Sequence, residues 1–308
     1  MPVDPQIQTM LDEVAGLPAM HTLPVETVRA GSEKRYASGS RQVPVGKVAD
    51  RTIPGPAGDL KLRVYTPEGA GPFPLIVFFH GSGFVICSLE THDTMCRHLC
   101  AGAGAVVVSV DYRLAPEHKF PAGSDDCLAA TIWAGSHCGE LNADPARIAL
   151  AGDSAGGNLA AVTALRARDE GGPGLCAQLL IYPVTDSGMD TPSFQQNAEG
   201  FGLSRNGMAW FWNHYLADPA DAGHPHASPL RAKDLSRLPP AFVLTAEYDP
   251  LRDEGELYAE RLIAAGVPTQ LTRYAGMNHG FFFWYDRVDT TRIAVGESCA
   301  WLRGRFST

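Results

Sequence analysis

The sequence has 308 residues, of which 45% are hydrophobic and 19% are charged, a composition typical of a globular protein with a sizeable buried core. Its 34 acidic and 25 basic side chains give a formal net charge of −9, and no run of lysine or arginine compensates for it locally. Because such a chain repels polyanions, we expect neither nucleic acid nor a membrane surface as a partner.

The N-terminal segment MPVDPQIQTMLDEVAGLPAM has no basic region followed by an apolar one, so it does not resemble a signal peptide. The longest apolar stretches, such as Leu75–Phe79 and Ala105–Val108, are far shorter than the roughly 20 residues that cross a bilayer. We therefore expect no transmembrane segment and a cytoplasmic location.

Seven cysteines are scattered along the chain without zinc-ribbon spacing, which suits a reducing compartment better than a disulfide framework. His92, Cys96 and Cys100 recur every four residues and would share one helix face, as metal ligands do. Buried thiols on a helix face are common, however, and no carboxylate or second histidine completes the set. We expect no metal site.

Residues 1 to about 45 predict one short amphipathic helix, Gln6–Val14, and then a connector containing glycine, serine and proline. This part of the chain carries no strong core signal. We interpret it as an appendage.

From Asp50 onward, β-branched or apolar runs alternate with segments of helical period. The order favours an α/β fold with a mainly parallel sheet covered on both faces. The predicted strands are Leu60–Thr66, Pro74–Phe79, Ala105–Asp111, Arg147–Gly152, Ala177–Tyr182, Ala241–Glu247 and Thr269–Tyr274. The predicted helices are His92–Ala103, Ser124–Ser136, Ala155–Asp169 and Asp253–Ala265, the last closed by Gly266.

The alternation lapses between Tyr182 and Ala241, where Ser204–Leu216 (SRNGMAWFWNHYL) is unusually aromatic. A Pro/His/Asp-rich stretch follows it. We interpret this region as an inserted cap segment.

Residues 152–156 (GDSAG) fit the pattern G-x-S-x-G between a predicted strand and a predicted helix. A serine on such a sharp turn has a strained backbone, which nearby glycines relieve, and the helix N-terminus favours negative charge beside it. The pattern alone is weak in a chain with 32 glycines, but this context favours Ser154 as a nucleophile over a plain glycine turn.

A serine nucleophile needs a general base and a carboxylate that orients the base. His279 lies in a turn-rich loop after the last predicted strand, and Asp249 lies just past the strand that ends at Glu247. The chain order Ser154, Asp249, His279 is that of α/β-hydrolase triads. The alternatives are that Asp249 caps the next helix and that His279 is a satisfied core residue.

The turn His80–Phe84 (HGSGF) follows an apolar strand, and its small residues would let the backbone approach a ligand. Acyl transfer passes through an oxyanion that backbone N–H groups stabilise, so we expect Ser82, Gly83 and Ala155 as donors. An ordinary glycine turn is the alternative. His80 is interpreted as a structural hydrogen-bonding residue.

Five motifs occur in order along the chain: residues 80–84 (HGSGF), 111–122 (DYRLAPEHKFPA), 152–158 (GDSAGGN), 249–255 (DPLRDEG) and 279–281 (HGF). In these motifs the sequence resembles the bacterial hormone-sensitive-lipase-like esterases, a family of the α/β-hydrolase superfamily. The resemblance rests on all five. It implies an eight-stranded sheet, a helical cap, and hydrolysis of short-acyl carboxylic esters without a cofactor. The implied division is residues 1–45 and 187–225 as cap, with 46–186 and 226–308 as catalytic domain.

One departure from the family pattern is Ser82, which replaces the middle of three glycines. A backbone donor survives that change. The resemblance also implies a homodimer through an edge strand and the C-terminal helix region.

Aromatic residues near these motifs either line a substrate pocket or pin the cap to the core. The residues considered for the pocket are Phe84, Trp210, Phe211 and Phe281. Two other functions compete with ester hydrolysis. A non-catalytic receptor on this fold would lack the histidine, whereas His279 is present; amide hydrolysis lacks a recognisable peptide-binding segment.

Overall fold

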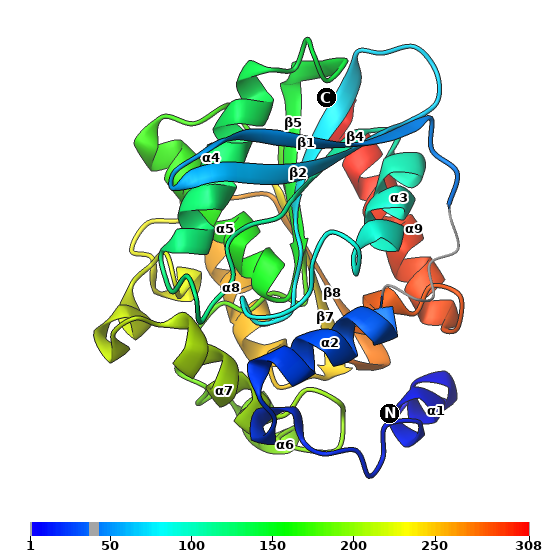
Figure 1. The fold of residues 1–308 in the computed structure, drawn as a ribbon, viewed down its shortest axis with the longest axis vertical. Coiled ribbons are helices and arrows are strands. Elements are labelled where there is room, and N and C mark those ends of the chain that lie inside the picture. The colour runs from blue at the N-terminus through cyan, green and yellow to red at the C-terminus, as the bar shows by residue number, and fades with distance from the viewer. Residues whose placement is uncertain (1, 37–42, 308) are drawn as a thin grey trace.

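The computed structural model describes residues 2–36 and 43–307, which form one eight-stranded sheet between helical layers (Figure 1). The strand order is β1-β2-β4-β3-β5-β6-β7-β8. The strands are β1 Lys47–Gly55, β2 Gly58–Thr66, β3 Phe73–Phe79, β4 Val106–Val110, β5 Ala143–Asp153, β6 Ala177–Ile181, β7 Ala241–Tyr248 and β8 Thr269–Asn278.

In this order the six strands from β4 to β8 are parallel to one another, whereas β2 pairs antiparallel both with β4 and with β1, with which it forms a hairpin at one edge. Parallel strands end at the same side of a sheet, so loops after β3, β5, β7 and β8 can converge there. The predicted α/β class and all seven predicted strands are confirmed.

The helices lie on both faces of the sheet and beyond one of its ends (Figure 1). They are α1 Pro5–Asp12, α2 Val25–Tyr36, α3 Asp93–Ala103, α4 Ala122–Ser136, α5 Ala155–Glu170, α6 Pro192–Gln196, α7 Arg205–Tyr215, α8 Arg252–Ala264 and α9 Asp289–Phe306. Short 3₁₀ turns occur at η1 Met20–Thr22, η2 Pro219–Gly223, η3 Pro229–Arg231 and η4 Phe281–Phe283. No helix in the described ranges is long and apolar enough to span a bilayer.

The strand β3 shows how the sheet divides the core. Its residues are almost all buried, as expected of a parallel strand covered on both faces. Leu75, Val77 and Phe79 belong to the cluster that includes α4 and α5, whereas Ile76 and Phe78 belong to the cluster that includes α3 and α9.

The predicted N-terminal helix Gln6–Val14 is confirmed as α1, but the prediction that only a connector follows it is wrong, because α2 (Val25–Tyr36) follows η1. This helix is polar and contains Gly31; it buries only Val25, Val28 and Ser32. A narrow apolar stripe interrupted by glycine gives a weak periodic signal. Residues 37–42 of the predicted connector lie outside the described residues.

The helices α1, α2, α6 and α7 lie together beyond one end of the sheet (Figure 1). They come from the segments predicted as the cap, and α7 matches the aromatic segment Ser204–Leu216. The division of the chain into a cap and a catalytic domain stays a prediction. Gly266 follows α8 with φ +81°, the left-handed conformation expected after a helix end.

Candidate active site

Ser154 occupies the turn between β5 and α5 with φ 55° and ψ −117°, a conformation that non-glycine residues rarely adopt. Its N–H donates to the carbonyl of Ile181 at 2.8 Å, which ties the turn to β6. A Cβ on Gly152 would overlap the Gly156 carbonyl, and one on Gly156 would overlap the Phe79 carbonyl. The two glycines are therefore required by the close approach of the backbone, as the sequence predicted.

His279 follows β8 directly and lies between Ser154 and Asp249. Its Nε2 is 2.9 Å from Ser154 Oγ, and its Nδ1 is 2.7 Å from Asp249 Oδ2. The ring of Tyr182 lies 4.7 Å from the imidazole, centroid to centroid, and limits its movement. The structure thus brings together the three residues that the sequence singled out.

Asp249 is fully buried after β7. Its Oδ1 accepts the N–H of Leu251 at 2.8 Å, which leaves Oδ2 directed at His279. The Asn197 side chain, from the inserted segment, donates to the Asp249 carbonyl at 3.0 Å. A buried carboxylate in this place favours the tautomer with the proton on Nδ1, so Nε2 has a lone pair for the Ser154 hydroxyl.

The turn after β3 has an unusual backbone at three successive residues. Ser82, Gly83 and Phe84 have φ values of 90°, 64° and 66°. Successive N–H groups in such a turn point into one concave surface, which suits an anion. Within residues 2–36 and 43–307, no protein acceptor takes the N–H of Ser82, Gly83 or Ala155. These three groups are available to a ligand.

His80, the first residue of the turn His80–Phe84, is held in the core by Tyr112. It is fully buried and stacks on Tyr112 at 4.4 Å, and the Tyr112 hydroxyl donates to the His80 carbonyl at 2.8 Å. Burial lowers the pKa of His80 to about 3, with nearby His92 acting in the same direction. A neutral, stacked imidazole suits the structural role that the sequence indicated.

Asp153 and His92 form a buried pair that sequence reasoning missed. Asp153 Oδ1 accepts the Gly81 N–H at 2.9 Å and lies 3.2 Å from His92 Nε2. Asp153 was visible inside the GDSAG pattern, but nothing in the spacing linked it to His92. The parallel pairing of β3 and β5 brings Gly81, shortly after β3, beside Asp153, and His92 joins them from the start of α3.

The predicted pocket residues separate into two groups. Phe84 is 2% exposed and stacks on Tyr215 at 3.8 Å, and Phe281 is fully buried with its ring 5.3 Å from Tyr274. Their positions favour packing over contact with a substrate. Phe211 covers the turn, because a Cβ on Gly83 would overlap its ring, and Trp210 lies beside Phe211 at 5.2 Å.

The considered metal ligands do not form a metal site in the described ranges, where no group of three His, Cys, Asp or Glu side chains could hold an ion. Cys96 and Cys100 are fully buried in the core. Burial raises the pKa of the Cys100 thiol to about 12, so it stays protonated. A protonated thiol is a poor metal ligand.

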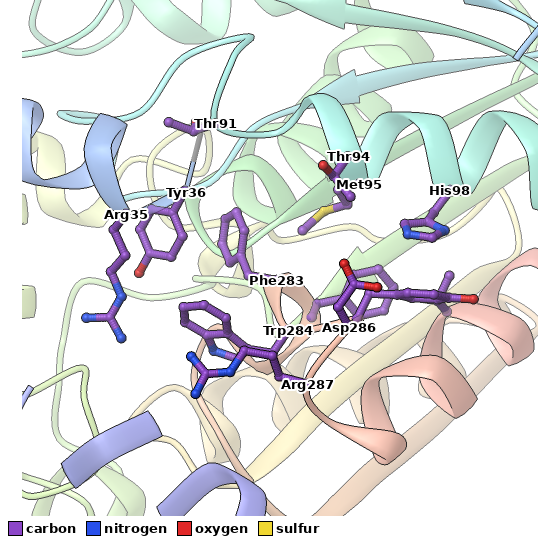
Figure 2. A pocket seen from close by; sticks show the side chains of 13 residues that line it. Arg35, Tyr36, Thr91, Thr94, Met95, His98, Phe283, Trp284, Asp286 and Arg287 are labelled. Atoms are coloured by element: carbon purple, nitrogen blue, oxygen red, sulfur yellow. The ribbon is translucent and has the colours of Figure 1, made fainter. Parts of the chain in front are cut away.

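A pocket of about 220 Å³ lies between the end of α2, α3 and the loop after His279 (Figure 2). Tyr36 and Phe283 stack in it at 4.5 Å, and Arg35 lies over the Trp284 ring at 5.2 Å. Arg287 at its edge is paired with Glu13 at 2.5 Å. Phe283 also reaches the buried pair, since its ring contacts His92 edge-on at 4.8 Å.

The chain is similar to a known protein family and to individual esterases. A family described as the α/β hydrolase fold matches residues 76–283. The carboxylesterase NlhH of Mycobacterium tuberculosis is 42% identical over 309 residues, covering 98% of this chain and 95% of the relative. The carboxylic ester hydrolase LipN of the same organism is 44% identical over 266 residues, covering 84% and 71%.

Solved structures are equally similar. The hyperthermophilic esterase from the archaeon Pyrobaculum calidifontis superimposes with a TM-score of 0.95 and 46% sequence identity, covering 99% of both chains. A thermostable esterase from Pseudomonas putida gives a TM-score of 0.96 at 39% identity, covering 99% of this chain and 98% of that one.

Proposed function

The chain belongs to the α/β hydrolase family and is a carboxylesterase, and on that premise we propose that it hydrolyses short-acyl esters through an acyl-enzyme on Ser154. The observation that carries the proposal is the position of His279, 2.9 Å from Ser154 Oγ and 2.7 Å from a fully buried carboxylate. This is the arrangement that makes a serine hydroxyl nucleophilic.

In the first half of the reaction, His279 Nε2 takes the proton of the Ser154 hydroxyl as Oγ attacks the ester carbonyl carbon. Asp249 stabilises the imidazolium that forms and keeps its orientation. The carbonyl oxygen becomes an oxyanion, which accepts the N–H groups of Ser82, Gly83 and Ala155. Each such donor contributes about 3 kcal/mol to the lowering of the barrier.

The tetrahedral intermediate collapses when His279 gives its proton to the leaving alkoxide, which departs as an alcohol. Water then attacks the acyl carbon while His279 takes one of its protons. The second intermediate releases the carboxylic acid and restores the Ser154 hydroxyl. No step requires a cofactor.

The short-acyl preference rests on the family resemblance and on the aromatic residues that cover the turn. Phe211 lies against Gly83, with Trp210 beside it, so space next to the oxyanion donors is restricted. We expect turnover of p-nitrophenyl esters to peak between acetate and hexanoate. A maximum at palmitate in a chain-length series would refute this preference.

A homodimer through β8 and α9 is a further part of the proposal. β8 lies at an edge of the sheet, and Ile293 on α9 is 56% exposed. Light scattering after gel filtration should give the mass of two chains. A single-chain mass at micromolar concentration would contradict it.

The direct test is removal of the nucleophile. Ser154→Ala should lower the turnover of a chromogenic butyrate ester by about 10⁵-fold or more, whereas Ser136→Ala, on the exposed end of α4, should leave it unchanged. Activity of Ser154→Ala within tenfold of the wild type would refute the assignment. A receptor function would instead show tight ester or acid binding with no turnover by the wild type.

A further inference from the structure

Arg29 joins the helix α2 to the segment that follows the oxyanion turn, residues 80–84. Its Nε donates to the Val85 carbonyl at 2.8 Å, and its Nη2 donates to the Ala115 carbonyl at 2.8 Å. Val85 directly follows the turn, and it belongs to the same apolar cluster as Val28, the neighbour of Arg29 on the helix. Arg29 lies outside the motifs that the sequence singled out, so its contacts with this segment call for a function.

Glu117 holds the guanidinium of Arg29 in place. Its carboxylate accepts from Nη1 at 2.7 Å and from Nη2 at 2.8 Å, which makes a bidentate ion pair. Hydrogen bonding to Arg29 lowers the pKa of Glu117 to about 2, so the carboxylate is ionised at neutral pH. The planar guanidinium therefore has a fixed orientation. A lysine, whose ammonium is a point charge, cannot make the same set of contacts.

The first contact of Arg29 leads to the Gly83 N–H through hydrogen-bonded peptide groups. The Val85 carbonyl that accepts from Arg29 belongs to the same planar peptide group as the Ile86 N–H. That N–H donates to the Ser82 carbonyl at 3.2 Å. The Ser82 carbonyl shares its own peptide group with the Gly83 N–H, one of the proposed oxyanion donors. Because each peptide group is planar, a hydrogen bond that fixes its carbonyl also fixes where its N–H points.

The second contact of Arg29 converges on the same carbonyl. The Ala115 carbonyl accepts from Arg29, and the Ala115 N–H donates to the Phe84 carbonyl at 2.9 Å. The peptide group of the Phe84 carbonyl also contains the Val85 N–H, which donates to the Ser82 carbonyl at 3.3 Å. Both paths therefore end at the Ser82 carbonyl.

The oxyanion turn needs such support because its backbone is strained. Ser82 and Phe84 have φ values of 90° and 66°, in the left-handed region that favours glycine. A residue in that region keeps its conformation only where the surrounding contacts impose it. A backbone donor lowers the barrier when it already points at the position of the oxyanion before the reaction begins, and a loosely held turn does not provide this.

We propose that Arg29 is a positioning residue of the esterase, which holds the peptide group between Ser82 and Gly83 so that the Gly83 N–H points at the oxyanion. The inference rests on the proposed function. Because Glu117 balances the charge of Arg29, the effect comes from position and from successive hydrogen bonds that strengthen one another, not from a net charge. The helix α2, from the segment that the sequence predicted as an appendage, thereby contributes to transition-state stabilisation.

The substitution Arg29→Met tests the proposal, because methionine keeps an unbranched side chain but has no donor. A displaced donor stabilises the oxyanion less, so kcat for p-nitrophenyl butyrate should fall about tenfold. KM should change less than about threefold, because the donors act mainly on the charge that develops in the transition state. Active sites are counted by titration with a fluorophosphonate, so that unfolded protein does not contribute to the measured loss of kcat.

A transition-state analogue gives the decisive readout. When a short-chain trifluoromethyl ketone binds, Ser154 Oγ adds to its carbonyl carbon, the hydroxyl proton passes to His279, and the resulting oxyanion accepts from the same donors. Its Ki should rise in Arg29→Met by the same factor as kcat/KM falls, about tenfold. A purely structural role of Arg29 would lower stability and leave Ki per active site unchanged. An unchanged Ki, or a raised KM with an unchanged kcat, would overturn the proposal.

Arg168→Met is the matched control. Arg168, near the C-terminal end of α5, also makes a bidentate pair with a carboxylate, that of Asp169. It also donates to two carbonyls, those of Asp234 at 3.1 Å and Ser236 at 2.8 Å. These contacts do not involve the oxyanion turn, so kcat and Ki should stay within about twofold of the wild type.

If Arg29→Met does not fold, Arg29→Lys replaces it. The lysine keeps the charge but cannot reproduce the fork of donors, so kcat should fall and Ki should rise by the same factor, at least about threefold. Unchanged values for Arg29→Lys would overturn the proposal. Wild-type protein without ester turnover would refute the proposed function instead.

Discussion

The substitution Asp249→Asn gives a sharp test of the candidate triad, because the structure fixes how the new amide must lie. Asp249 Oδ1 accepts the Leu251 N–H at 2.8 Å. In the asparagine variant the amide oxygen keeps this place, and the NH₂ group faces His279 Nδ1. The imidazole must then accept at Nδ1 and carry its proton on Nε2, where it cannot take the proton of Ser154.

The size of the loss follows from two contributions. Turning the amide around would place its NH₂ against the Leu251 N–H, which costs about 1–3 kcal/mol for an unsatisfied buried donor. The productive orientation is therefore populated roughly 5- to 150-fold less. Loss of the negative charge beside the imidazolium adds to this, and comparable triads lose about 10⁴ in kcat, or about 5 kcal/mol.

The assay is steady-state turnover of p-nitrophenyl butyrate between pH 6 and 9, with circular dichroism to confirm folding. The matched control is Asp253→Asn, four residues further on, whose carboxylate accepts the Ser193 N–H and does not contact His279. We expect the control to stay within about threefold of the wild type. A kcat for Asp249→Asn within tenfold of the wild type would refute the tautomer argument.

Three other substitutions test the turn, the core and the buried charge. In Gly83→Ala the new Cβ would overlap the Phe211 ring, and the residue would keep a φ of 64°, so kcat should fall at least about tenfold. The loss should be smaller when Phe211 is also replaced by alanine. Equal losses with and without Phe211→Ala would contradict the overlap. The Asn158 side chain donates to two carbonyls, those of Val184 at 3.0 Å and Ala227 at 2.8 Å. Asn158→Ala removes this donor and should lower the free energy of unfolding, measured by urea titration, by about 2 kcal/mol. An unchanged urea midpoint would contradict this prediction. Burial raises the pKa of Glu254 well above its ordinary value of 4.5, so the folded state binds the proton more tightly than the unfolded state and stability falls as pH rises above that value. Glu254→Gln should therefore gain stability relative to the wild type between pH 5 and pH 8, and the opposite trend would show that the carboxyl is ionised in the fold.

Much of the fold was predictable because central parallel strands are continuous apolar runs. The residues of β3 are buried on both faces, and such a run stands out between turns. The edge strand β1 was missed for the opposite reason. It buries only Ile53, carries charged residues at Lys47, Asp50 and Arg51, and contains Pro54, which only edge strands tolerate.

The candidate triad was predictable because each of its members follows a strand. Chain order and strand ends determined Ser154, Asp249 and His279 before any geometry was known. His92 has no such signal, because its partner Asp153 is 61 residues away and the contact depends on how the start of α3 packs against the end of β5. The aromatic residues were ambiguous for a similar reason, since burial of Phe281 depends on packing and not on its position in a motif.

Two predictions concern the whole chain and not its site. The cytoplasmic location and the division into cap and catalytic domain remain predictions from sequence. Limited proteolysis would test the second, since cleavage should concentrate at the junctions near residues 45, 187 and 225.

The central claim is that Ser154 forms the covalent intermediate, and one measurement tests it most directly. The wild-type protein is treated with one equivalent of a fluorophosphonate, which phosphonylates activated serines, and the modified peptide is identified by mass spectrometry. We predict one adduct per chain, on the peptide that contains Ser154, with loss of esterase activity in proportion to labelling. Full activity after labelling, or an adduct on another residue that accounts for the loss, would contradict the claim.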